Sequence, residues 1–177
     1  MSRVMRNEMG CAVVAKGDAV FERVESSLAS WLCDQSGGNY LEIEIVGIGL
    51  TQRMREWLVR DCVRERVAIP YEATSMVDEL RAAQFVPGRG AWTWCRLWMD
   101  VSDGVLHQEC DWMREPDFGS VPAGAGEYAI ELDIYPRDPE CVPGWLAERA
   151  AAYEKRKERN ARRREARRRK REQERGG

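Results

Sequence analysis

The sequence predicts an α+β domain: an antiparallel sheet with helices packed on one face, plus a charged C-terminal tail that is either a helix or disordered. Three observations lead to this fold class. Some segments have helical periodicity, others alternate apolar and polar residues, and the arginine-rich end has no apolar stripe to dock. The 177 residues suit one domain with its own core. We expect an acidic body, residues 1–147, and a basic tail, residues 148–177.

The first two elements are a helix and a strand. Apolar residues recur at spacings of three and four over residues 16–35, which predicts an amphipathic helix that ends at Gly37-Gly38. Tyr40 to Ile48 alternates apolar residues with Glu42 and Glu44, which predicts a half-buried strand with a polar outer side. The apolar residues of the helix are Val20, Val24, Leu28, Trp31 and Leu32.

Residues 51–69 fit either a helix or strands, and strands are the favoured interpretation. Pro70 ends this segment, and residues 74–85 then predict a second helix. Thr74 or Ser75 is its expected N-cap, with acidic residues following where the helix dipole favours them. Its inward stripe is Met76, Val77, Leu80 and Ala83.

A β-hairpin is predicted over residues 92–112, because Asp103-Gly104 separates two alternating segments. With these two residues as the loop, Leu97 lies opposite Cys110 and Arg96 opposite Asp111. This register gathers apolar side chains on one face and charged ones on the other. The apolar face comprises Cys95, Leu97, Met99, Cys110 and Trp112.

A last strand is predicted from Tyr128 to Tyr135, with its carboxylates facing outward. Together, the outward positions of the sheet form a flat acidic face with two tryptophans. Tryptophan is enriched at interface hot spots, so this pattern favours a partner-binding surface over an ordinary solvated face. The candidate binding residues are Glu42, Glu44, Trp94, Trp98, Glu109, Asp111, Glu131 and Asp133.

The net charge of −2 hides two regions of opposite sign. Residues 148–177 hold 14 Lys and Arg against 6 Asp and Glu, which is a net charge of +8. The remaining 14 basic and 24 acidic residues lie in residues 1–147, which gives the body a net charge of −10. An acidic body of this kind is expected to attract a basic partner.

The tail has no large apolar residue after Tyr153, but the pairs Glu158/Arg162 and Glu165/Arg169 could support an isolated helix. Its arginine runs suit contact with a nucleic-acid backbone. They suit equally a solubilising appendage, or a segment that folds back on the acidic sheet. The candidate nucleic-acid contacts are Arg162, Arg163, Arg164, Arg167, Arg168 and Arg169.

Little in the sequence indicates an enzyme. The six cysteines are far apart with no C-x-x-C pair, and His107 is the only histidine, so no zinc, redox or multi-histidine site is expected. Carboxylates at every second position of a strand make a flat surface rather than a catalytic pocket. We expect no catalytic residue, no metal and no cofactor.

No apolar run approaches the roughly 20 residues needed to span a membrane. The charges of residues 1–11 are scattered and do not follow a signal-peptide pattern. We expect a cytoplasmic protein with free thiols and without a membrane partner.

A series of short motifs follows one another in the second half of the chain. In order, they are Pro87 to Trp92, the hairpin strand ending at Asp111, Glu115 to Phe118, Tyr128, Leu132, Tyr135 to Arg137, and Val142 to Leu146. In this order and spacing they resemble the YezG-like family of bacterial immunity proteins. The resemblance covers about residues 73–146. The chain differs from the family in having Trp112 and Met113 in place of an aromatic-acidic pair, and in its long arginine-rich tail.

The resemblance implies an antitoxin, and the acidic face would fit a basic, nuclease-type toxin whose active site or substrate groove it covers. In this hypothesis the carboxylates take the place of nucleic-acid phosphates. The alternative is a nucleic-acid-associated protein that acts through its tail, with the body as a scaffold. An enzyme of another type is the second alternative.

Overall fold

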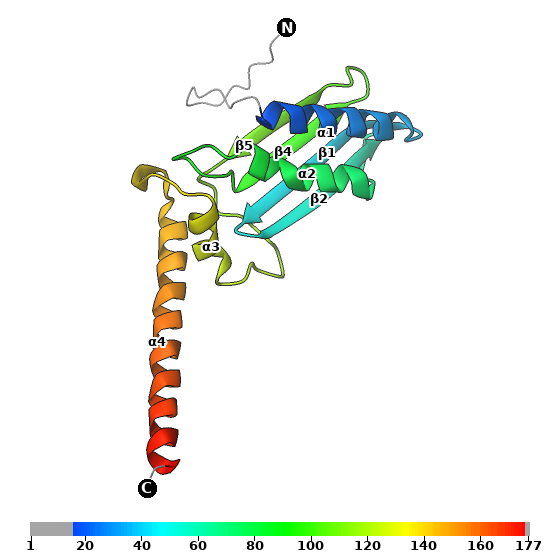
Figure 1. Cartoon of the computed structure of the whole chain (residues 1–177). Helices are drawn as coiled ribbons and strands as arrows, with labels where there is room; N and C mark the ends of the chain where they lie inside the picture. Colours follow the sequence, from blue (N-terminus) through cyan, green and yellow to red (C-terminus); the bar gives the residue numbers. More distant parts are fainter. Residues whose placement is uncertain (1–15, 176–177) are drawn as a thin grey trace.

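The computed structural model describes residues 16–175 and has the expected α+β architecture (Figure 1). Five strands form one antiparallel sheet in the order β3-β2-β1-β4-β5. The elements are α1 Lys16–Cys33, β1 Gly38–Ile48, β2 Thr51–Arg60, β3 Val63–Arg66, α2 Tyr71–Ala83, β4 Trp94–Asp100, β5 Leu106–Asp111, α3 Glu127–Ile134, the 3-10 helix η1 Pro139–Cys141, and α4 Gly144–Arg175.

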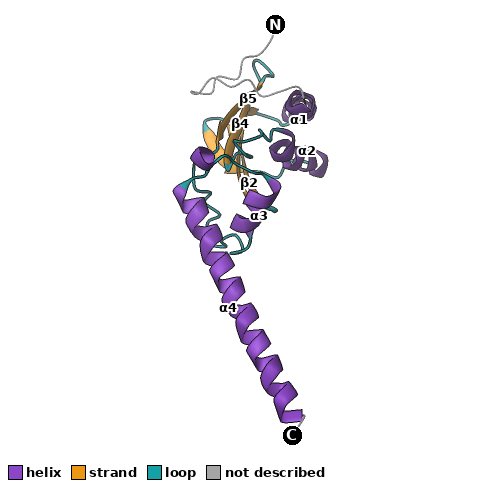
Figure 2. Cartoon of the chain, turned by 60° about the vertical axis from the view of Figure 1, so that its left-hand side comes forward, coloured by secondary structure: helices purple, strands orange, loops and turns teal. Residues whose placement is uncertain are grey.

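Helices α1 and α2 lie together on one side of the sheet, as predicted (Figure 2). Between them and the sheet is the main core, which takes every second residue of the central strands. Leu41, Ile43 and Ile45 of β1 and Leu97 and Met99 of β4 are all buried in it. Strict alternation on β1 and β4 therefore sends one set of side chains to the helices and the other set to the opposite face.

A smaller second core lies on the other face, at the end of the sheet where β1 finishes. Val46 and Ile48 pack there against Phe118 of the segment after β5, Tyr128 of α3 and Leu146 of α4. Part of the outer face is therefore covered by the C-terminal elements.

Two expectations for the first half of the body differ in outcome. Residues 51–69 contain the strands β2 and β3, which confirms the favoured interpretation. The predicted N-cap of the second helix is wrong, because α2 begins at Tyr71 after Pro70, without a side-chain cap. The Thr74 N–H and hydroxyl both donate to the Pro70 carbonyl, at 3.0 and 3.2 Å, so the first helical turn already closes on Pro70 and Thr74 lies within the helix.

The predicted hairpin register is wrong by two residues. Leu97 lies opposite Gln108, Cys95 lies opposite Cys110, and the connection spans residues 101–105. The side chains of Asp100 and Asp103 accept hydrogen bonds from backbone N–H groups within this connection, which stabilises a wider loop than a two-residue Asp-Gly turn. A slip of two residues leaves each side chain on its predicted face, so the apolar face is as expected.

The predicted strand from Tyr128 to Tyr135 is also wrong, because this segment is the helix α3. Its apolar residues alternate, but they also fit a spacing of four, with Tyr128 and Leu132 both packed in the second core. Gly126 precedes the helix and Pro136 follows it, which sets its limits.

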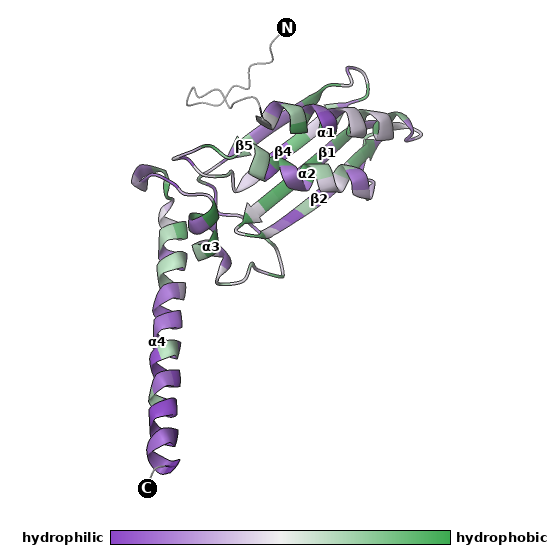
Figure 3. Cartoon of the chain, in the orientation of Figure 1, coloured by the Kyte–Doolittle hydropathy of each residue, from purple (hydrophilic) through white to green (hydrophobic). Residues whose placement is uncertain are grey.

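Helix α4 begins on the body and continues away from it as one long helix (Figure 1). Leu146 and Ala150 are buried, and Arg149 forms an ion pair with Glu115, so residues up to about Tyr153 belong to the body. The part of α4 after Tyr153 is mostly hydrophilic, with a pale-green stretch midway along it (Figure 3), and its only apolar residues are Ala161 and Ala166. Within residues 16–175, no helix is long and apolar enough to cross a membrane.

Candidate protein-binding face

The outer face of the sheet carries six of the eight predicted binding residues. Strand pairing places Glu42 between Trp57 and Trp98, and Glu44 between Arg55 and Arg96. At the β5 edge, His107 lies beside Trp98 and Glu109 beside Arg96. The face is thus a grid of aromatic and charged side chains.

One half of this grid is closed and the other is open. In the closed half, Trp94 packs in the second core, and Arg53 and Arg55 donate hydrogen bonds to the backbone carbonyls of Phe118 and Asp117. In the other half, the tryptophans belong to neither core and stay partly exposed. We call this half the open face; it comprises Tyr40, Glu42, Trp57, Arg64, Arg66, Arg96, Trp98, His107 and Glu109.

Both tryptophans of the open face are held by neighbouring side chains. The guanidinium groups of Arg64 and Arg66 lie over the Trp57 ring, 4.1 and 5.3 Å from its centroid. The Trp98 ring stacks on His107, with centroids 5.3 Å apart and an interplanar angle of 13°. These contacts orient the rings without burying them. The rings would therefore lose less conformational entropy when a partner binds.

The acidic character predicted for this face is largely neutralised. Glu42 accepts a hydrogen bond from Arg96 at 3.0 Å and forms an ion pair with Arg64 at 3.3 Å. Arg96 also donates to the Tyr40 hydroxyl at 3.2 Å. The Glu42 carboxylate therefore links β3, β1 and β4 across the face, and is not a free negative charge.

Glu44 is engaged in the same way. Arg55 and the Trp94 indole N–H each donate to its carboxylate at 3.0 Å. Partial burial alone would raise the pKa of Glu44, but these two hydrogen bonds and the charge of Arg55 outweigh it and lower the pKa below its ordinary value. Glu44 therefore stays ionised and paired.

At the β5 edge the two predicted carboxylates differ. Asp111 accepts hydrogen bonds from the backbone N–H groups of Met113 and Arg114, so it shapes the exit of the strand. Glu109 is exposed and has no ion pair among residues 16–175. The prediction of a flat acidic face is therefore wrong in composition: the face alternates arginine, carboxylate and tryptophan.

Glu131 and Asp133 are not on the sheet at all, because they belong to α3. Asp133 is exposed, whereas Glu131 is completely buried. Glu131 accepts hydrogen bonds from Arg81 of α2 at 2.6 Å, from Arg137 at 3.3 Å and from the Gly49 N–H at 2.8 Å. Glu131, Arg81, Arg137 and the Gly49 N–H form a buried cluster that links α3 and α2 to the β1–β2 turn, and we call this cluster the clasp.

The clasp also brings together two segments that are far apart in the sequence. Arg137 donates to the backbone carbonyls of Ala91 and Trp112, and burial lowers its pKa from the ordinary arginine value although Glu131 raises it. Gly90 has a φ of 85°, and a Cβ there would lie 2.6 Å from Nε of Arg137. The Pro87–Trp92 and Tyr135–Arg137 segments thus meet in space and serve the fold.

Three further residues of the outer face, Trp57, Arg64 and Arg66, are not among the predicted binding residues. For Trp57 the sequence signal is the alternation of Arg55, Trp57 and Val59, which matches the outward side of a strand. This signal places Trp57 on the face only once the pairing partner of residues 51–69 is known. With β2 placed beside β1, Trp57 lies opposite Glu42.

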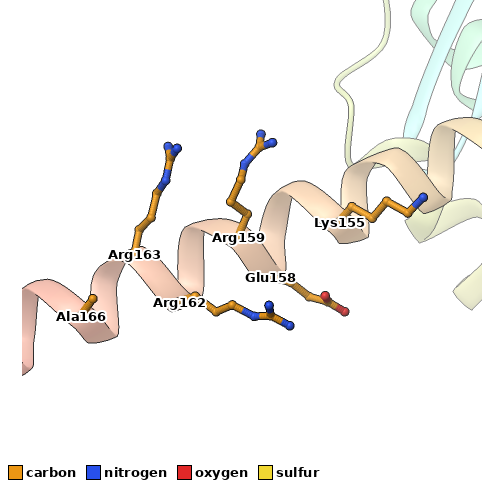
Figure 4. A pocket seen from close by; sticks show the side chains of 6 residues that line it. All are labelled: Lys155, Glu158, Arg159, Arg162, Arg163 and Ala166. Atoms are coloured by element: carbon orange, nitrogen blue, oxygen red, sulfur yellow. The ribbon is translucent and has the colours of Figure 1, made fainter.

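The six predicted nucleic-acid arginines all lie on the exposed part of α4. Arg169 pairs with Glu165 and Arg168 with Glu172, whereas the expected pair between Glu158 and Arg162 is not formed. Figure 4 shows a shallow groove between side chains of α4, in which Arg159 and Arg163 project together on one side and Glu158 and Arg162 on another. One helix alone lines this groove, so it is open to solvent.

Across the described part of the chain, no group of three or more His, Cys, Asp or Glu side chains could hold a metal ion. Cys95 is buried in the main core, and Cys110 lies beside it and packs against the same core. Burial, together with the Cys95 thiol, raises the pKa of Cys110 well above its ordinary value, which favours the protonated, less nucleophilic form of this thiol. Cys11 lies outside the described residues.

Comparison with known proteins gives no further guide to the function. No family model matches the chain, and no curated protein matches it.

Proposed function

We propose that this chain is an immunity protein, an antitoxin that binds and neutralises a cognate bacterial toxin through its open face. The observation that carries the proposal is the placement of Trp57 and Trp98 outside both cores, on a sheet face that also presents arginines. Trp, Tyr and Arg are the residues enriched at interface hot spots, and a solvated sheet face gains little from exposed indole rings.

The contacts of the open face change how neutralisation would work. Because Glu42 on the open face and Glu44 beside it are paired with arginines, these carboxylates position the arginines and do not imitate phosphates. Affinity would come mainly from Trp57 and Trp98, which insert into the toxin and exclude water from its active site or substrate groove. The net charge of −10 on residues 1–147 would speed encounter with a basic, nuclease-type toxin.

The test uses a basic, nuclease-type toxin, sought first among the products of the neighbouring genes. Replacing both rings, Trp57→Ala with Trp98→Ala, should weaken binding by roughly 30-fold per ring and abolish protection of cells that express the toxin. Tyr71→Ala is the matched control, because Tyr71 is 80% exposed on α2, on the other side of the sheet. This control should bind and protect as well as the unaltered chain.

Two results would contradict the proposal. If the double variant protects cells as well as the unaltered chain, the open face is not the interface. If the unaltered chain neither binds that toxin nor protects against it, the immunity function itself is wrong. Thermal unfolding of each variant shows whether a loss of protection is a loss of folding.

A further inference from the structure

The second charged region of the molecule is the exposed part of α4, residues 154–175, which we call the arm. It holds 13 Lys and Arg against 5 Asp and Glu, a net charge of +8. At a rise of about 1.5 Å per residue it is roughly 33 Å long. Figure 1 shows it projecting away from the sheet and both sheet-covering helices, so its action is independent of the open face.

The charges of the arm are sorted around the helix. Four of its five carboxylates follow spacings of four, seven and seven, which places them within about 40° of arc in a helix of 3.6 residues per turn. This acidic stripe comprises Glu154, Glu158, Glu165 and Glu172. Most of the remaining circumference is basic. The fifth carboxylate, Glu174, lies on the side opposite the stripe and pairs there with Lys170 at 3.8 Å.

The acidic stripe accounts for the stability of a helix without a core. Its carboxylates pair with Lys157 at 3.3 Å, Arg169 at 2.5 Å and Arg168 at 3.6 Å, all one turn away. Such pairs contribute about 0.2–0.5 kcal/mol each to an isolated helix. These three cations thus have a structural role within the arm.

Four arginines on the side opposite the acidic stripe are not stabilised by ion pairs within the helix. Arg159, Arg163, Arg167 and Arg171 follow one another at a spacing of four, and none forms an ion pair with any residue in 16–175. Like charges at this spacing destabilise a helix. We call these four residues the arginine row; a spacer helix would gain stability if they were neutral or alternated with glutamate.

We propose that the arm binds double-stranded DNA in the major groove, with the arginine row toward the duplex and the acidic stripe toward solvent. The major groove of B-form DNA admits an α-helix and surrounds it with a floor and two phosphate walls. A helix that is mainly basic outside one narrow stripe is complementary to that enclosure.

Other anionic partners fit the arm less well. No Leu, Ile, Val, Met or aromatic residue occurs in residues 154–175, so the arm lacks the apolar face of a membrane-surface helix and the stacking rings that hold single strands. The major groove of duplex RNA is too narrow for a helix. An acidic protein surface would contact only one side of the basic circumference.

The experiment measures binding of the full chain to a DNA duplex about two turns long, by fluorescence anisotropy between about 50 and 200 mM salt. One variant, Arg159→Gln with Arg163→Gln and Arg167→Gln, removes three charges from the arginine row. The matched control, Lys157→Gln with Arg168→Gln and Arg169→Gln, removes three charges that pair with the acidic stripe. Both variants have the same net charge.

The row variant should bind DNA at least tenfold more weakly, and its salt slope should fall by about three. The control should bind several-fold more tightly than the row variant. Circular dichroism should show the reverse order of helix content, since the row variant loses repulsions and the control loses ion pairs. Opposite orders in these two measurements would not arise from helix stability alone.

Several results would overturn the proposal. They are equal losses of DNA affinity in the two variants, equally tight binding of the unaltered chain to single-stranded DNA, duplex RNA, anionic phospholipid vesicles or polyglutamate, and no binding to the duplex at all. The first would mean that only net charge matters, and the second would mean that the arm attracts any polyanion.

Discussion

The two faces of the central strands β1 and β4 differ in burial. Alternation along each strand sends apolar side chains to one face and charged or aromatic side chains to the other. On the covered face, Ile43 and Leu97 lie opposite each other and are fully buried. On the other face, Glu42 lies opposite Trp98, and both remain partly exposed. Burial of apolar area stabilises the fold on one side, so the other side is available for ion pairs and rings that stability does not require. Substitutions should therefore separate folding from binding.

The largest loss of stability is expected from a substitution in the clasp, at the end of the sheet, and not on either face. Glu131→Gln leaves Arg81 and Arg137 buried without a countercharge, which should destabilise the protein by about 3–5 kcal/mol. Asp133→Asn changes an exposed carboxylate on the same helix and should cost less than about 0.5 kcal/mol. Urea denaturation measures both, and equal effects would show that the clasp does not stabilise the fold.

The next effect compares two neighbours on β4 that point to opposite faces. Leu97→Ala should cost about 2–5 kcal/mol, because it opens a cavity in the main core. Trp98→Ala removes a larger side chain but should cost under about 1 kcal/mol, because its ring lies outside both cores. If Trp98→Ala proved the more destabilising in urea, the open face would be part of the folding core.

The smallest effect concerns the pH dependence from Glu44. Since its pKa is lowered by folding, its contribution to stability is complete above the unfolded pKa of about 4.3 and is lost as the pH falls through the folded pKa. Glu44→Gln should therefore lose less stability than the unaltered protein when acidified from about pH 5 to pH 3. Parallel pH profiles of the two proteins would show that the Arg55 and Trp94 contacts do not matter in solution.

The sequence predicts an element correctly where only one of its faces is buried, in a single core. The helix α1, the strand β1 and the apolar side of the hairpin have a single periodicity, and each lies where expected. Residues 128–135 satisfy two periodicities, and tertiary contacts with Arg81 and Arg137 decide between them. No local sequence pattern predicts that Glu131, which lies among apolar residues, is buried at the centre of the clasp.

For the candidate site, alternation predicted which side chains point outward but not what they meet. Glu42 and Glu44 are on the outer face as expected, yet their partners Arg64 and Arg55 come from strands whose order in the sheet no local pattern fixes. Charge counted along one strand therefore overestimated the acidity of the face. The net charge of the face depends on which residues lie side by side on neighbouring strands, and the sequence alone does not give this pairing.

The most direct test of the open face as an interface is hydroxyl-radical footprinting of the chain with and without the toxin that we propose as its partner. Oxidation of Trp57 and Trp98 should fall strongly in the complex, because an anchor ring becomes inaccessible to solvent. Oxidation of Tyr71, on the helix-covered side, should stay unchanged. A complex in which Trp57 and Trp98 remain as reactive as in the free chain would contradict the account.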